Sequence, residues 1–196
     1  MIKINKMKSK LIILGTMLCV SSLGVAQDVA QDSSKLGNLL KIECSFTGVG
    51  LNYELPIGKK LSLDNGLGLT AGVQVLNDRV HYEKNVLNPS SYVKSELKYY
   101  YNRHIRIAKK LPTSFGQGSY FGYQSKFMTQ RVFDDKLKLS NILMCEGHWG
   151  VQRVFSNNWM VNFHIGLGRA FDFTTKGSSN YMAFGLKVAY FIRKMK

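Results

Sequence analysis

The sequence predicts an all-β protein in which eight short antiparallel strands close into an up-and-down barrel. Apolar and polar residues alternate with a period of two along most of the chain after residue 36. Gly, Asn, Ser or Pro separate the alternating runs, and no stretch keeps a helical period for long. Closure into a barrel removes the exposed edges that such a sheet otherwise presents.

Length and composition agree with a single folded domain. The chain has 196 residues, of which 45% are hydrophobic and 20% charged, so it is neither disordered nor a bundle of membrane helices. With 3 Pro and 18 Gly it is not collagen-like or proline-rich. The formal net charge of +15 indicates an anionic partner, either nucleic acid or an anionic membrane.

Residues 1–27 are predicted to be a signal peptide. The segment begins with four lysines, Lys3, Lys6, Lys8 and Lys10, and continues with an apolar run over residues 11–20. Small residues precede the expected cleavage point: Ser21, Ser22, Gly24 and Ala26. The apolar run is about half of the roughly 20 residues that a permanent anchor needs. We therefore expect an exported protein that does not meet nucleic acid, with residues 28–37 as a short N-terminal periplasmic segment.

Six alternating runs predict one strand each, over residues 61–75, 93–101, 120–130, 141–152, 159–170 and 181–192. The segment 40–55 is different, because its apolar residues change from even to odd positions at Thr47-Gly48. A two-residue hairpin turn there pairs Phe46 with Val49 and Lys41 with Glu54, and brings the number of strands to eight. A β-bulge in one longer strand also shifts the phase and gives seven.

Glycines on the polar face indicate that this face lines the inside of a narrow barrel, where large side chains need small ones opposite them. They are Gly66, Gly68, Gly72, Gly122, Gly150, Gly166, Gly168 and Gly185. A turn centred on Asn157 places His148 opposite Gly166, Glu146 opposite Gly168 and His164 opposite Gly150. The apolar face then points outward, as in a transmembrane β-barrel.

Aromatic residues and loop lengths agree with a transmembrane barrel over residues 38–192. Aromatic side chains gather on the apolar face toward one rim, as in the aromatic girdles of membrane barrels: Tyr53, Tyr99, Tyr101, Phe121, Tyr123, Trp159 and Tyr190. Short turns suit the periplasmic side, and longer loops the outside. The expected periplasmic connections are 56–60, 156–158 and a long link over 103–118 with a helical turn at 104–110; the outer ones are 76–90, 131–138 and 171–180. Residues 193–196 form a basic C-terminal tail.

The predicted mature chain keeps two cysteines, Cys44 and Cys145. Both are placed on the outward face of non-adjacent strands, too far apart for the roughly 4 Å between Cβ atoms that a disulfide requires. We expect two free thiols.

With these features the chain resembles the small outer-membrane β-barrel proteins of Gram-negative bacteria, such as OmpX and the membrane domain of OmpA. The resemblance covers residues 38–192 and rests on the architecture together with the signal peptide. The chain is similar in particular to uncharacterised short barrels with a tyrosine-rich strand such as residues 97–102 followed by a basic link. This resemblance implies an outer-membrane location and contact with outer-membrane lipid. We expect a monomer.

One rim of the predicted barrel collects most of the excess positive charge. It holds Lys59, Lys60, Arg103, Arg106, Lys109, Lys110, Arg153, Arg193 and Lys194, whereas acidic and basic residues nearly cancel in the outer loops. We expect this basic periplasmic rim to contact anionic phospholipid headgroups. A solvated rim without a specific partner is the alternative.

The polar face also carries charged residues that are expected to form an internal network, because buried charges need partners. They are Lys41, Glu54, Glu96, Lys98, Lys126, Glu146, His148, His164 and Lys187. A carboxylate near two imidazoles also suits acid–base catalysis, but no nucleophile stands beside the histidines. The His-x-Ser pairing of outer-membrane lipid A deacylases is absent as well. His81 and His104 have no second metal ligand at a suitable spacing, so no metal or other cofactor is expected.

The functional prediction is a small integral outer-membrane barrel with a side-chain-filled lumen and a structural or interaction role in the cell envelope, rather than an enzyme. A transporter of small or apolar molecules and a soluble periplasmic ligand-binding barrel are the alternatives. A lipid-modifying outer-membrane hydrolase is the enzymatic one.

Overall fold

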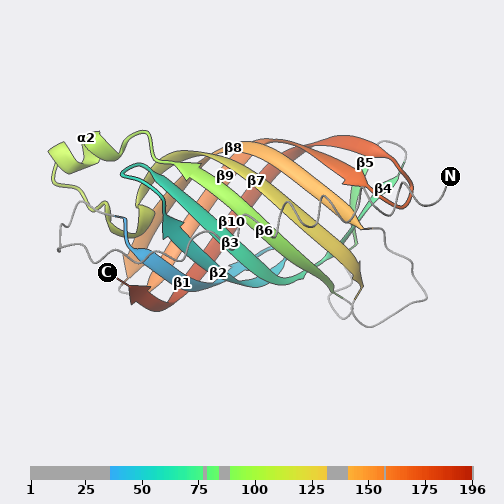
Figure 1. Cartoon of the computed structure of the whole chain (residues 1–196), viewed down its shortest axis with the longest axis horizontal. Helices are drawn as coiled ribbons and strands as arrows, with labels where there is room; N and C mark the ends of the chain where they lie inside the picture. The colour runs from blue at the N-terminus through green and yellow to red at the C-terminus, as the bar shows by residue number, and fades with distance from the viewer. Residues whose placement is uncertain (1–35, 77–78, 84–88, 132–140, 157, 196) are drawn as a thin grey trace. The chain divides into compact units, whose positions relative to one another are not determined.

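The computed structural model describes residues 36–76, 79–83, 89–131, 141–156 and 158–195. Eight antiparallel strands close into a barrel (Figure 1), in the order β1-β10-β9-β8-β7-β6-β3-β2. Their bounds are β1 Asn38–Ser45, β2 Gly48–Pro56, β3 Leu61–Thr70, β6 Ser90–Tyr99, β7 Gly118–Arg131, β8 Ile142–Ser156, β9 Trp159–Asp172 and β10 Ser178–Met195. The predicted eight-stranded antiparallel barrel is confirmed. The predicted signal peptide lies outside the described residues.

The two ends of the barrel differ. At the linker end, β6 and β7 are joined by a connection that holds the helix α2, Arg103–Ala108, and the 3₁₀ turn η1, Ser114–Gly116. The predicted helical turn in this link is confirmed. At the opposite end, which we call the hairpin end, a two-stranded sheet of β4, Gly72–Leu76, and β5, Arg79–Glu83, lies between β3 and β6 in sequence. Within the described residues, no helix is long and apolar enough to cross a membrane.

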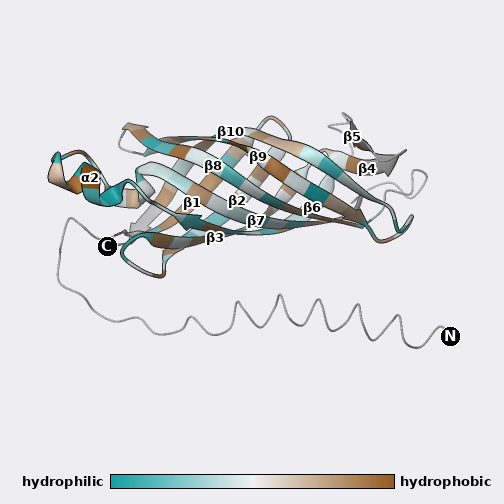
Figure 2. Cartoon of the chain, turned by 90° about the horizontal axis from the view of Figure 1, so that it is seen from above, coloured by the Kyte–Doolittle hydropathy of each residue, from teal (hydrophilic) through white to brown (hydrophobic). Residues whose placement is uncertain are grey.

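The polar face of the strands points into the barrel and the apolar face points out. In β6, Lys94, Glu96 and Lys98 are buried, while the outward Val93 and Leu97 are 63% and 40% exposed. In β3, Asp64 is fully buried and the outward Leu67 is 61% exposed. Figure 2 shows hydrophobic and hydrophilic residues alternating along the barrel strands. This arrangement is the inverse of a soluble ligand-binding barrel, whose interior is apolar.

The phase change near Thr47 is a hairpin turn, not a bulge, but its register differs from the prediction by two residues. Ser45 pairs with Gly48 and Cys44 with Val49, so that Phe46 and Thr47 form the turn. Gly48 is already part of β2. The position requires glycine, because a Cβ atom there would collide with the backbone carbonyl of Leu69 on β3. A shift of two residues keeps every side chain on its predicted face.

The predicted strand over 61–75 is wrong after Thr70, and the loop predicted over 76–90 contains the strand β5. Gly48 is the first residue of β2, and Thr70 is its partner, so β3 has no further ladder partner on that side. Ala71 N and Thr70 Oγ1 both donate to Thr47 O, at 2.6 and 3.2 Å. Beyond this point the chain leaves the barrel wall, and β4 pairs with β5 instead.

Apolar clusters fill both ends of the barrel interior. At the hairpin end Val73 of β4 packs with inward side chains of the barrel, which are Tyr92, Met128, Ile142, Met144 and Ala170. At the linker end Phe115 packs against a cluster of Leu39, Met160, Ala189 and Phe191, with a centroid distance of 5.7 Å between the rings of Phe115 and Phe191. The polar residues of the lumen therefore lie between two apolar layers.

Several finer predictions agree with the structure, and several strand and loop bounds do not. His148 pairs with Gly166, Glu146 with Gly168, and His164 with Gly150, as predicted. Cys44 and Cys145 are free thiols, as predicted. The expected basic tail is not separate, because β10 continues to Met195 and pairs with β1 over residues 193–195. Likewise β9 ends at Asp172 and β10 begins at Ser178, so the loop predicted over 171–180 is shorter.

Candidate functional site: the polar lumen

The linker half of the lumen holds a group of four charges. Lys41 Nζ lies 2.8 Å from Glu54 Oε2 and 2.8 Å from Asp64 Oδ2. Lys98 Nζ lies 3.2 and 2.8 Å from the same two oxygens. All four side chains are almost completely buried. Each lysine therefore contacts two carboxylates and each carboxylate two lysines, which offsets the cost of removing four charges from water.

Neutral groups satisfy the second oxygen of Glu54, whereas Asp64 Oδ1 has no hydrogen-bond partner among the described residues. Tyr100 and Ser62 each donate to Glu54 Oε1 at 2.8 Å. Lys98 also donates to Gln152 Oε1 at 3.2 Å, and Asn162 donates to the same oxygen. The direct opposition expected for Lys41 and Glu54 is wrong, because Asn52 pairs with Lys41. The ion pair forms diagonally instead, within reach of a long side chain.

A second charged group occupies the middle of the lumen. Glu43 Oε1 accepts from Lys94 at 2.6 Å and lies 3.8 Å from Lys187 Nζ. Lys187 also lies 3.5 Å from Glu96, whose other oxygen is 3.1 Å from His148 Nε2. These residues come from β1, β6, β8 and β10, so the network ties opposite walls of the barrel together.

Glu146 joins the two histidines to this network. Its Oε1 lies 3.4 Å from His148 Nδ1 and 3.7 Å from His164 Nε2. Gln124 and Tyr181 also donate to Glu146, at 3.1 and 2.8 Å. The imidazole rings are 4.7 Å apart between centroids. Within the described part of the chain, neither imidazole forms a hydrogen bond with a serine, threonine or cysteine side chain.

Lys126 is the exception among the predicted network residues. Its Nζ lies 3.4 Å from Thr70 Oγ1 and 4.3 Å from the centroid of the Tyr92 ring. Among the described residues no carboxylate lies within 4.0 Å of it. Lys126, although predicted as a member of the charged network, therefore forms no ion pair with a described carboxylate.

Sequence reasoning missed three charged residues of the network, Glu43, Asp64 and Lys94. Glu43 and Lys94 each lie two residues from a predicted member on the same face, Lys41 and Glu96 respectively, and Asp64 lies on the polar face of the alternating run 61–75. A complete count of charges on the inward face of every strand would have found them. The polar partners Gln124, Gln152 and Asn162 were missed for the same reason.

The predicted basic rim is placed as follows. Lys59, Lys109 and Lys110 are exposed, and Lys60, Arg106 and Arg153 are half-buried at the linker end. Arg193 and Lys194 belong to β10, but their side chains lie outside the described residues. Arg103 differs from the prediction because it is buried.

Arg103 and Arg106 hold the connection together rather than extending into solvent. Arg103 Nη1 donates to Thr113 O at 2.6 Å, and burial lowers the pKa of its guanidinium. Arg106 donates to Pro112 O through two nitrogens, at 3.2 and 2.8 Å. Both arginines therefore fold residues 111–113 back toward α2.

The described residues contain no group of three His, Cys, Asp or Glu side chains arranged to hold a metal ion. His104 is exposed on α2, and the side chain of His81 lies outside the described residues.

Comparison of the chain with protein families, with curated proteins and with solved structures finds no match in any of the three.

Proposed function

We propose that this protein is an integral outer-membrane barrel with a side-chain-filled lumen and a structural or interaction role in the cell envelope. The observation that carries the proposal is the direction of the two strand faces. Large apolar side chains are exposed around the barrel, while ten charged side chains lie inside it: Lys41, Lys94, Lys98, Lys126, Lys187, Glu43, Glu54, Asp64, Glu96 and Glu146. Soluble monomers rarely expose so large an apolar surface, whereas a lipid-facing barrel requires it.

The aromatic side chains at the linker end support the same proposal. Phe121 is 57% exposed and stacks on Tyr101 at a centroid distance of 5.2 Å. Trp149 Nε1 donates to the Tyr101 hydroxyl at 3.0 Å. Trp159 and Tyr190 form a second such pair, at 5.1 Å. Aromatic rings with a polar tip are typical of the headgroup level of a membrane.

The filled lumen argues against a transport role. Ion pairs cross the middle of the barrel, and an apolar cluster lies at each end of its interior. An eight-stranded barrel leaves room for side chains rather than for an aqueous channel. We accordingly expect no conductance in planar bilayers. The Glu146 cluster is read as a structural network, and no catalytic role is proposed for it.

The linker end is proposed to face the periplasm and to contact anionic headgroups of the inner leaflet. The connection exposes three apolar side chains, Ile105, Ile107 and Leu111, next to the exposed Lys109 and Lys110. An apolar face beside basic residues is typical of segments that lie at a membrane surface. In this proposal residues 1–27 direct export and are removed.

Envelope fractionation with gel electrophoresis tests the proposed function. We expect the protein in the outer-membrane fraction, extracted only by detergent, with different gel mobility before and after boiling. The difference reports a barrel that stays closed in detergent until it is heated. Recovery in the soluble periplasmic fraction without detergent would overturn the proposal.

A further inference from the structure

The barrel wall is incomplete between β1 and β10 at the hairpin end. β1 ends at Ser45, whose partner on β10 is Lys187, but β10 continues to Ser178. Over residues 178–186 the strand pairs with β9 only, and no described strand pairs with its other edge. The opening is bounded by the turn at residues 46–47, by β10 and by β5, which contacts β10.

A cavity of about 120 Å³ lies at this opening and reaches from the lumen to the outer surface. Its lining joins inward charged residues, including Lys94, Lys126 and Lys187, to the outward apolar residues Phe46, Phe184 and Leu186. Phe46 is 82% exposed and Phe184 65%. The cavity is therefore charged at its inner end and apolar at its mouth.

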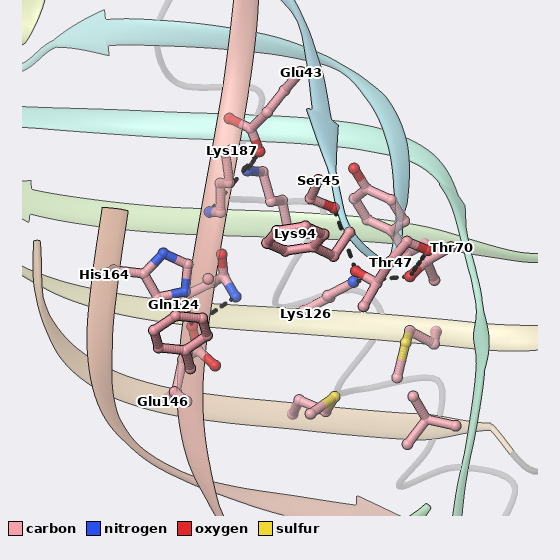
Figure 3. A pocket seen from close by; sticks show the side chains of 18 of the residues that line it. Glu43, Ser45, Thr47, Thr70, Lys94, Gln124, Lys126, Glu146, His164 and Lys187 are labelled. Atoms are coloured by element: carbon pink, nitrogen blue, oxygen red, sulfur yellow. Dashed lines mark hydrogen bonds and ion pairs between the residues drawn. The ribbon is translucent and has the colours of Figure 1, made fainter. Parts of the chain in front are cut away.

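Among the described residues, Lys126 is the cation at the inner end that has no carboxylate within 4.0 Å. Glu43 contacts Lys94 and Lys187, and Glu146 contacts Gln124, Tyr181 and the two histidines. The contacts of Lys126 Nζ within the described part of the chain are the Thr70 hydroxyl at 3.4 Å and the Tyr92 ring, whose centroid is 4.3 Å away. Figure 3 shows Lys126 beside Thr70, apart from the groups around Glu43 and Glu146. A partly buried ammonium group in this position favours an anion.

We propose that the cavity binds a single-chain anionic amphiphile, with its phosphate or carboxylate head at Lys126 and its acyl chain leaving through the wall past Phe46 and Phe184. The volume suits a head group and a few carbon atoms, since a cavity of ~150 Å³ holds a molecule the size of benzene. The rest of the chain lies outside, in the apolar phase around the barrel. This inference rests on the proposed membrane location, which supplies that phase.

Methyl NMR of methionine in the full mature chain, folded in a neutral detergent, tests the proposal. Met128 and Met144 line the cavity, and Met160 lies in the cluster at the linker end as an internal control. We expect decyl phosphate to shift the Met128 and Met144 signals saturably and to leave Met160 unchanged. Decanol and inorganic phosphate should each bind at least tenfold more weakly, because each supplies only one part of the contact.

Substitutions separate the head-group contact from the chain contact. Lys126→Gln should weaken decyl phosphate binding at least tenfold, and Lys126→Arg should restore most of it. Phe184→Ser should weaken binding severalfold, while Phe121→Ser, a similarly exposed position on β7, should not. Heat-modifiable mobility of each variant shows whether its barrel is folded.

Three outcomes overturn the proposal. If decanol binds as tightly as decyl phosphate, the cavity has no anion site. If inorganic phosphate binds as tightly, the acyl chain makes no contact. If Lys126→Gln leaves the shifts unchanged, the ligand binds elsewhere. If the protein proves soluble without detergent, the membrane location fails, while the same titration in water still tests the cavity.

Discussion

At the residue scale, two kinds of residue hold the lumen together. Lysines each contact two carboxylates, and glycines leave space for aromatic and imidazole rings. The imidazole of His148 lies over Gly122 and that of His164 over Gly185, where a Cβ atom would collide with each ring. Large and small residues thus alternate around the interior, as a narrow barrel requires.

Lys98→Met should lower the free energy of unfolding by about 3–5 kcal/mol, because it leaves Glu54 and Asp64 with Lys41 as their only cation in contact. Urea unfolding in detergent, followed by the fluorescence of Trp149 and Trp159, measures the change. Lys59→Met is the matched control at an exposed site, where we expect a change within about 0.5 kcal/mol. Equal effects of the two substitutions would contradict the ion-pair account.

Gly185→Val should destabilise the barrel by about 1–3 kcal/mol, since its side chain would overlap the His164 ring. Gly147→Val is the control, because Gly147 faces outward on β8 with no atom within 4 Å of an added Cβ. The same urea titration should find Gly147→Val nearly neutral. A neutral Gly185→Val would mean that the His164 ring does not pack against β10.

Contacts between residues could be predicted from the sequence where the strand register could be predicted. The opposition of His148 and Gly166 was predictable because a turn centre and a large-to-small pattern both fixed the register. The partner of Lys41 was not, because the hairpin turn lies at residues 46–47 rather than at Thr47-Gly48. The burial of Arg103 could not be predicted from the sequence either, because its guanidinium donates to a backbone carbonyl ten residues away.

At the element scale, the barrel strands and the helical turn in the long link were predictable, but the β4–β5 hairpin was not. Period-two alternation places every barrel strand, but it continues through Val73 and Val75 although the wall ends at Thr70. The end of β3 depends on where its neighbour β2 begins, which is tertiary information. A local signal for the β4–β5 hairpin existed, because Asn77-Asp78 separates two short alternating runs.

Lys109→Glu tests the proposed membrane contact of the connection that holds α2. Each basic residue near an anionic surface contributes on the order of 1 kcal/mol, so the reversal should remove about 2 kcal/mol of stability in vesicles with anionic lipid. In neutral vesicles the same variant should match the parent protein, because Lys109 is exposed. Equal losses in both lipids would show that Lys109 acts within the fold instead.

At the scale of the whole molecule, the fold class was predictable. The direction of the apolar and polar strand faces distinguishes a membrane barrel from a soluble one. The same alternation describes a soluble barrel with an apolar interior. The glycines on the polar face, the aromatic residues near one rim and the loop lengths indicated the inverse arrangement. The structure places the charges inside and the apolar residues outside. The cavity at the wall opening was not predictable, because it arises from unequal strand lengths on β1 and β10.

The most direct test of the account is whether the outer face contacts lipid, and two isoleucines of equal exposure measure it. Ile165 lies in the middle of β9 and is 43% exposed, whereas Ile57 lies in the turn after β2 and is 45% exposed. The measurement is the free energy of unfolding from lipid vesicles. Ile165→Arg should cost about 2–4 kcal/mol and Ile57→Arg about 0–1 kcal/mol, because an arginine on the lipid face costs most near the bilayer midplane. Equal, near-zero effects of the two substitutions would show that Ile165 faces water and would contradict the account.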